Sequence, residues 1–232
     1  PAQGMTHREP ARLVVLISGT GRNLQALIDA STRGDLGAQI VKVISNRSAV
    51  AGLARAEAAG IATQTIDHRG FDTREAFDAA LGDAIAAAAP DIVALAGFMR
   101  ILTADFIRRF EGRLLNIHPS LLPKYRGLHT HRRALEAADR WHGASIHFVT
   151  EELDGGPVVL QGRIAVEPED TEQTLARRVM EEVELLIYPA AVRWMAGGRL
   201  RLQDHLAWLD DTRPQTPVQW PLDDAAPDSV NP

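Results

Sequence analysis

Residues 13–23, LVVLISGTGRN, join an apolar strand to a helix through a glycine-rich turn. The first five are apolar and rich in β-branched side chains, which is typical of a strand buried on both faces of a parallel sheet. Leu24, Leu27 and Ile28 then repeat at helical spacing. A strand, a turn and a helix in this order predict an α/β fold.

The same alternation continues along the chain. The expected elements are strands over 40–45, 62–66 and 92–96, and helices over 50–59, from Asp72 to Pro90, and over 104–110. Asp72 and Glu75 resemble a capping box, so we expect Asp72 to cap its helix.

The second half of the chain predicts a change of strand direction. Strands are expected over 113–118, 144–149 and 158–166, with helices over 130–139 and from 171. The hairpin spacing around residues 153–157 favours antiparallel pairing. We expect Leu186 to face inward on the last helix and a kink before Pro189.

The composition limits the classes of protein that this chain can be. Its 232 residues, 45% of them hydrophobic, suffice for one large core. No apolar run approaches the roughly 20 residues of a membrane span, and no signal peptide is visible, so we expect a cytoplasmic protein without a membrane partner. The lack of cysteine excludes disulfides and thiolate intermediates. A net charge of −5 without a basic run argues against nucleic acid as a partner.

One domain is expected over residues 11–210. Residues 1–10 are polar and without periodicity, so we expect them to be disordered, and residues 1–4 before Met5 resemble an expression remnant. Residues 211–232 are rich in proline and acids and poor in apolar side chains, which predicts a flexible tail.

The turn at residues 18–23 is a candidate phosphate site. Its glycines let backbone N–H groups approach an anion at a helix N-terminus. Gly19 and Gly21 are present, but no third glycine opens the helix, so the dinucleotide fingerprint is incomplete. A plain tight turn without a ligand is the alternative.

Polar side chains at strand ends form the candidate catalytic group. Asn116 and His118 lie two residues apart and share a face of their strand, which Pro119 ends. With Asp154 they could carry out acyl transfer: the amide holds an oxyanion, the imidazole moves a proton, and the carboxylate orients the imidazole. Purely structural roles in capping and turns remain the alternative.

Two other chemistries are weaker interpretations of the same region. A hydrolase triad of Ser120, His118 and Asp154 lacks the Gly-x-Ser-x-Gly elbow. His129 and His131 could join His118 or His142 at a metal, but no His-x-x-x-His pattern or carboxylate cluster supports this. We therefore predict no metal site.

Four blocks together carry a family resemblance: residues 18–25 (SGTGRNLQ), 96–102 (AGFMRIL), 115–125 (LNIHPSLLPKY) and 147–157, with HFV followed by LDGGP. Over about residues 12–210 the chain closely resembles the phosphoribosylglycinamide formyltransferases, a folate-dependent family. The resemblance implies a single-domain, Rossmann-like, mostly parallel seven-stranded sheet with helices on both faces and an antiparallel C-terminal part.

The resemblance also implies an activity and a set of site residues. The activity is direct transfer of formyl from the co-substrate 10-formyltetrahydrofolate to the amine of glycinamide ribonucleotide, in purine biosynthesis, by a monomer or homodimer. The implied catalytic residues are Asn116, His118 and Asp154, and the implied ribonucleotide residues are Gly21, Arg22, Asn23 and Glu184. The implied folate residues are Arg74, Met99, Arg100, Ile101, Leu102 and Asn116.

Two departures from the family pattern affect the ribonucleotide site. Arg22 stands where the family usually has serine, and its guanidinium would add positive charge beside a phosphate. Glu184-Leu185 stands for a Glu-His pair, with one extra residue in the preceding helix, so Glu182 competes with Glu184 for the ribonucleotide contact. The rival functions are formyltetrahydrofolate hydrolysis, another formyltransferase-fold activity, and a non-catalytic ribonucleotide-binding module.

Overall fold

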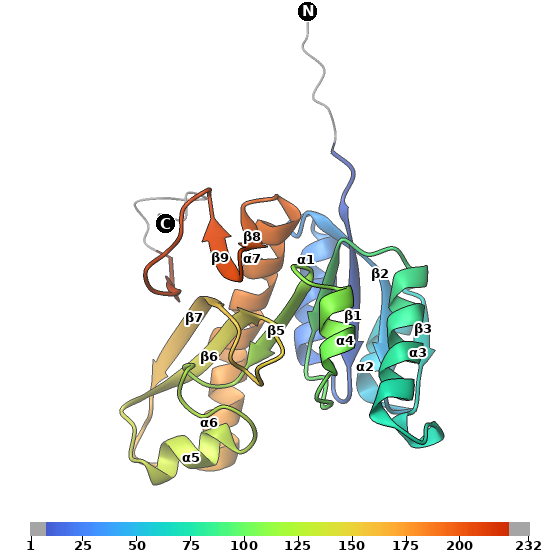
Figure 1. Cartoon of the computed structure of the whole chain (residues 1–232). Coiled ribbons are helices and arrows are strands. Elements are labelled where there is room, and N and C mark those ends of the chain that lie inside the picture. The colour runs from blue at the N-terminus through green and yellow to red at the C-terminus, as the bar shows by residue number, and fades with distance from the viewer. Residues whose placement is uncertain (1–7, 223–232) are drawn as a thin grey trace, which may run out of the picture.

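The computed structural model describes residues 8–222 and is built on an eight-stranded sheet (Figure 1). The strands pair in the order β10-β7-β6-β5-β4-β1-β2-β3, and only β6 runs against the others. Their bounds are β1 (Ala11–Ile17), β2 (Ala38–Ser45), β3 (Thr63–Thr65), β4 (Ile92–Leu95), β5 (Leu114–His118), β6 (Trp141–Phe148), β7 (Val158–Ala165) and β10 (Val218–Trp220). A separate hairpin joins β8 (Leu200–Gln203) to β9 (Leu206–Leu209).

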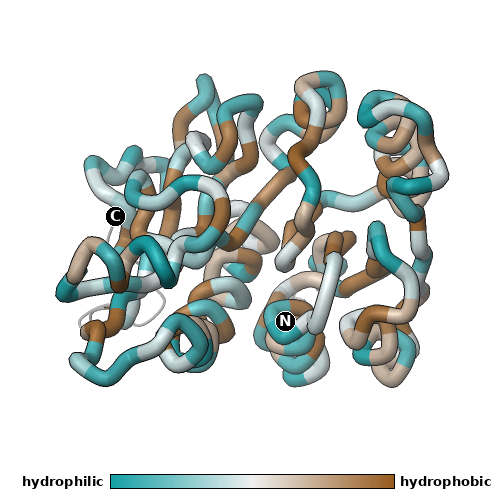
Figure 2. The backbone as a smooth tube through the Cα atoms, turned by 90° about the horizontal axis from the view of Figure 1, so that it is seen from below, coloured by the Kyte–Doolittle hydropathy of each residue, from teal (hydrophilic) through white to brown (hydrophobic). Residues whose placement is uncertain are grey.

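Helices cover both faces of the sheet. Alternate residues of β1 divide between two cores: Leu13, Val15 and Ile17 face one, while Val14 and Leu16 face the other. The first core is covered by α1 (Arg22–Thr32), α2 (Ala51–Ala58), α6 (Glu172–Val179) and α7 (Leu185–Ala196), and the second by α3 (Arg74–Ala87) and α4 (Ala104–Arg109). The short α5 (Thr130–Glu136) follows β5. Figure 2 shows apolar residues along the strands inside and hydrophilic residues on the outer helical turns.

The strand order creates a switch point between β1 and β4. The chain moves outward through β2 and β3, then returns to place β4 on the other side of β1, with β5 next to it. Ligands bind beyond the carboxyl ends of strands at such a point. The segments that follow β1, β4 and β5 all emerge at this edge, so it is the expected position of a site.

The predicted α/β fold with helices on both faces and an antiparallel part is confirmed, and several details differ. Thr73, not Asp72, caps α3, because its side chain accepts the N–H of Ala76. Leu186 is 46% exposed rather than inward-facing. The irregularity of the last helix is a π-helical turn at Met180–Glu184, whereas α7 continues through Pro189. A π turn takes up one residue more than an α turn, which accounts for the extra residue noted in the sequence.

The sheet has eight strands instead of the seven expected. The additional strand, β10, comes from the segment predicted as a flexible tail: Val218–Trp220 pairs in parallel with Leu160–Gly162 of β7. Three apolar side chains of this segment pack against the first core: Val218, Trp220 and Leu222. This packing stabilises the segment, and its proline-rich composition gave no sign of it. Residues 1–7 and 223–232, also predicted to be disordered, lie outside the described residues. No helix within residues 8–222 is long and apolar enough to cross a membrane.

Candidate active site

The three predicted catalytic residues converge at the end of β5. Asp154 lies in the turn before β7, and its Oδ2 is 3.5 Å from Nδ1 of His118. Both side chains are more than 90% buried, at 9% and 7% exposure. Asn116 is two residues before His118 on the same strand. An amide, an imidazole and a carboxylate therefore meet at the sheet edge where ligands bind.

His147 is a fourth member of this group, and sequence reasoning gave it no role. It is paired with Asn116 in the antiparallel register of β5 and β6. Its Nδ1 donates to the carbonyl of Phe148 at 2.9 Å, so in the neutral ring Nε2 accepts the Nδ2–H of Asn116 at 3.1 Å. Burial lowers the pKa of His147, which favours this neutral form. The alternating pattern of residues 144–149 together with the hairpin register was the signal that could have found it.

His147 also fixes which donor of Asn116 remains available. One N–H of the amide is used by Nε2 of His147, which leaves the second N–H for another acceptor. The Oδ1 of Asp154 is 3.7 Å from the same Nε2, too far for a hydrogen bond and as expected for two acceptors that face each other. The arrangement presents one oriented amide donor beside His118.

The loop after β5 closes over the catalytic group with its own backbone. The carbonyl of Tyr125 accepts from Nε2 of His118 at 2.8 Å, and the N–H of Gly127 donates to Oδ2 of Asp154 at 2.8 Å. Lys124 and Tyr125 are in turn held by Asp139, at 2.9 and 2.5 Å. Backbone groups of Tyr125 and Gly127 thus each take up one hydrogen-bonding atom of His118 and Asp154.

The turn after β1, predicted to hold a phosphate, depends on a glycine backbone. Gly21 adopts a φ of +74° and precedes the first residue of α1, Arg22. A Cβ at Gly21 would lie 2.6 Å from the Cα of Gly52, so both the conformation and the close approach require glycine. Nη1 of Arg22 lies 3.6 Å from Glu181, and both side chains are partly exposed.

Asn23 and Glu184 form a buried pair between α1 and the π-helical turn. The Nδ2 of Asn23 donates to Oε1 of Glu184 at 3.1 Å, while Oδ1 of Asn23 is buried without a partner among the described residues. Burial raises the pKa of Glu184 to about 7. Glu182 instead pairs with Arg178 at 3.3 Å and is half-exposed. Of the two competing glutamates, only Glu184 faces the turn at residues 19–23.

The predicted folate residues split between an exposed loop and the core. Met99 and Ile101 are 64% and 59% exposed, and Nη2 of Arg74 donates to the carbonyl of Ile101 at 2.8 Å. Leu102 is buried in the second core, so its side chain supports the loop from below. The guanidinium of Arg100 lies 5.3 Å from the ring centroid of Phe77, and its Nε is buried without a partner among the described residues.

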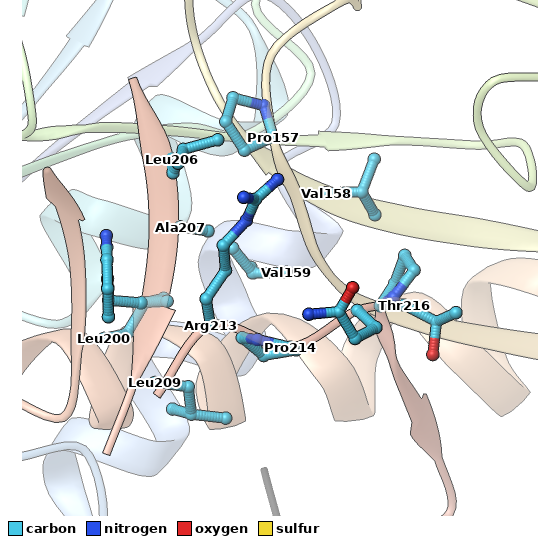
Figure 3. A pocket seen from close by; sticks show the side chains of 13 residues that line it. Pro157, Val158, Val159, Leu200, Leu206, Ala207, Leu209, Arg213, Pro214 and Thr216 are labelled. Carbon is cyan, nitrogen blue, oxygen red and sulfur yellow. The ribbon is translucent and has the colours of Figure 1, made fainter. Parts of the chain in front are cut away.

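Two hollows lie away from the catalytic group. One of about 230 Å³ lies between the start of β7, the β8–β9 hairpin and residues 213–217 (Figure 3). The other, about 390 Å³, adjoins the turn after β1 and includes Arg22 and Arg55. His131 and His142 pair with each other at 3.0 Å, and no group of three possible metal ligands occurs within residues 8–222.

The comparisons with known proteins identify the family of this chain. The formyl transferase family model matches residues 11–192. The chain belongs to this formyl transferase family.

The relatives of this chain carry more specific names than the family does. A phosphoribosylglycinamide formyltransferase of Escherichia coli is 53% identical over 201 residues, which cover 87% of this chain and 94% of that protein. A solved structure of the phosphoribosylglycinamide formyltransferase of Coxiella burnetii matches with a TM-score of 0.84 and 47% identity, covering 88% of this chain and 96% of that one. The human trifunctional purine biosynthetic protein adenosine-3 is 45% identical; the match covers 88% of this chain but only 20% of that protein.

Proposed function

We propose that this protein transfers the formyl group of 10-formyltetrahydrofolate to the amine of glycinamide ribonucleotide, in de novo purine biosynthesis. The observation that carries the proposal is the convergence of Asn116, His118 and Asp154 at one strand end, in a chain 53% identical to a protein of that name. The folate serves as co-substrate. We expect the protein to act in the cytoplasm as a monomer or homodimer.

The trio supplies what a direct transfer needs. The substrate amine attacks the formyl carbon, a C–N bond forms, and the carbonyl oxygen becomes an oxyanion. The free N–H of Asn116 and protonated His118 donate to that oxygen. The adduct then breaks its bond to N10 of the folate, which takes up the proton that the amine gives up. Asp154 stabilises the imidazolium across this sequence.

The loop at residues 124–128 has to exchange contacts for this to occur. In the structure Nε2 of His118 donates to the carbonyl of Tyr125, and Asp154 accepts from Gly127. A bound formyl oxygen would replace the Tyr125 carbonyl at the imidazole. Movement of this short loop therefore controls access to the catalytic group.

The two substrates are assigned to neighbouring strand ends. The ribonucleotide phosphate would lie on the turn at Gly21, Arg22 and Asn23, and Glu184 would meet the ribose side of the same molecule. The unpartnered Oδ1 of Asn23 is an acceptor, so it would meet a hydroxyl or N–H of the ribonucleotide and not its phosphate. The folate would occupy the exposed face of residues 99–102, beside Arg74. Both proposals place the reacting groups next to β5.

The test measures tetrahydrofolate formation by absorbance, with and without glycinamide ribonucleotide. Turnover that requires the ribonucleotide is the expected result. Asp154→Asn should lower kcat by about 100-fold or more, because the imidazolium loses its carboxylate. The matched control Asp83→Asn, on the exposed side of α3, should leave turnover unchanged. Folate hydrolysis without ribonucleotide, or unchanged turnover in Asp154→Asn, would refute the proposal.

A further inference from the structure

We propose that a polar chain formed by the buried Ser18 and Asn46 and the partly exposed His68 is a positioning network for the folate. It holds the loop at residues 97–102, here called the folate loop, in register with the phosphate turn at residues 19–23. The inference rests on the proposed function, because it assumes that the folate binds to this loop. According to this inference, residues outside the catalytic group determine the affinity for the folate and not for the ribonucleotide.

The folate loop needs such support because its backbone does not supply its own. Within the described part of the chain, residues 97–102 take part in no backbone-to-backbone hydrogen bond. Side chains hold it instead: Oγ of Ser18 accepts the N–H of Met99 at 2.8 Å, and Arg74 donates to the carbonyl of Ile101 at 2.8 Å. The shape of the loop is therefore set by residues on other elements.

Ser18 connects the folate loop to the phosphate turn. It directly follows β1 and directly precedes the phosphate turn. Its Oγ also donates to Oδ1 of Asn46 at 2.5 Å, which fixes the direction of the hydroxyl and turns its lone pairs toward Met99. Ser18 and Asn46 are 2% and 3% exposed, so water does not replace either contact.

The chain of contacts returns to the folate loop at a second point. Nδ2 of Asn46 lies 3.3 Å from Nδ1 of His68, which accepts in the tautomer that carries its proton on Nε2. The His68 ring meets Phe77 edge-on, with centroids 6.3 Å apart. The guanidinium of Arg100 lies over the same Phe77 ring, 5.3 Å from its centroid. Met99 and Arg100 are thus both attached to the same network, one by a hydrogen bond and one by ring contacts.

The arrangement predicts an effect on one substrate only. Loss of the Ser18 hydroxyl leaves the N–H of Met99 without its acceptor and frees the loop on its folate side. The phosphate turn keeps its own supports, because Gly52 donates to the carbonyl of Gly19 at 3.0 Å and Arg55 to that of Thr20 at 2.8 Å. The catalytic group also keeps its contacts. A general loss of structure would instead weaken both substrates and turnover together.

The experiment compares Ser18→Ala and His68→Ala with wild type. We expect Ser18→Ala to raise the KM and the equilibrium Kd of the formyl folate about tenfold, with the KM of the ribonucleotide and kcat within about twofold. His68→Ala, at a partly exposed position, should shift the folate constants in the same direction by about threefold. The matched control is Ser31→Ala, whose hydroxyl donates to the carbonyl of Ala38 and touches neither loop; it should change neither constant.

Two results would overturn the network. One is a folate KM and Kd within twofold of wild type in both variants. The other is an equal rise in the KM of both substrates, which indicates general loosening. If Ser18→Ala does not fold, His68→Ala alone decides by the same criteria. Absence of ribonucleotide-dependent turnover in wild type would refute the proposed function instead, and folate Kd measured without ribonucleotide still tests the network.

Discussion

Glu184 shows how one buried side chain links the proposed ribonucleotide site to the stability of the protein. It is 5% exposed and accepts a hydrogen bond from Asn23. Burial raises its pKa from 4.5 to about 7. Between these values the folded protein keeps a proton that the unfolded chain releases. The stability that depends on this proton is present below pH 4.5 and is lost as the pH rises through about 7.

The variant Glu184→Gln isolates this effect. An amide replaces the protonated carboxyl and does not ionise, so the variant should gain stability relative to wild type as the pH rises from 5 to 8, by up to about 3 kcal/mol. Urea unfolding at both pH values measures the difference. Glu182→Gln, on the same turn but half-exposed, is the control. An equal pH slope in wild type and Glu184→Gln would contradict the assignment.

Single residues at the site were predictable where a pattern in the sequence carried them. Asn116 and His118 were identifiable because two polar side chains end an apolar strand, and Gly21 because it precedes a helix after a strand. His147 was not, because its role depends on lying opposite Asn116 across β5 and β6, and register is a property of paired strands. Glu184 was the preferred glutamate, but Glu182 remained a competitor for a related reason: the π-helical turn that rotates one of them inward leaves no mark in helical periodicity.

The contact between α5 and β6 depends on two neutral histidines. Nδ1 of His131 lies 3.0 Å from Nε2 of His142, and desolvation lowers the pKa of both, that of His142 to about 4. Asp139 favours protonation of His142, whereas His118 and Lys124 oppose it. Glu172 favours protonation of His131, and His118 opposes it. Between pH 6.5 and 4 the unfolded chain binds more protons than the folded protein, so stability falls as the pH falls through this range.

His142→Gln should reduce this acid sensitivity, because only His131 of the pair still titrates. Glutamine does not titrate, so the loss of unfolding free energy between pH 7.5 and 5 should be smaller in the variant than in wild type. Titration of Glu184 changes the stability in the opposite direction over part of this range. Wild type and variant are therefore compared at the same two pH values, because the Glu184 contribution is the same in both proteins. Urea unfolding gives the numbers, with the exposed His205→Gln as control. A variant that loses as much stability on acidification as wild type would refute the role of the pair.

At the scale of the whole molecule, the C-terminal strand closes an otherwise open sheet edge. β10 pairs with β7, which would present unpaired backbone groups without it. Gln219 donates to Oε1 of Gln161 at 3.2 Å, and Nε2 of Gln161 donates to the carbonyl of Leu122 at 2.9 Å, a few residues after His118. Composition alone predicted a flexible tail here, because a strand of three residues among prolines gives no periodicity. The segment is ordered by its pairing with the edge strand β7.

Deletion of residues 217–232 tests this closure against deletion of residues 223–232 alone. The difference between the two truncations reports residues 217–222. We expect the longer deletion to lower Tm by about 5 to 10 °C relative to the shorter one, because it exposes the β7 edge and the apolar surface that Val218 and Trp220 cover. Turnover at 20 °C should agree within about threefold, since no hydrogen bond of Asn116, His118 or Asp154 in the described chain involves this segment. Scanning calorimetry and the folate assay measure the two quantities. Equal Tm values would mean that β10 does not stabilise the sheet. A large loss of turnover in a fully folded longer deletion would mean that the hydrogen bonds from Gln219 through Gln161 to Leu122 position the loop after β5.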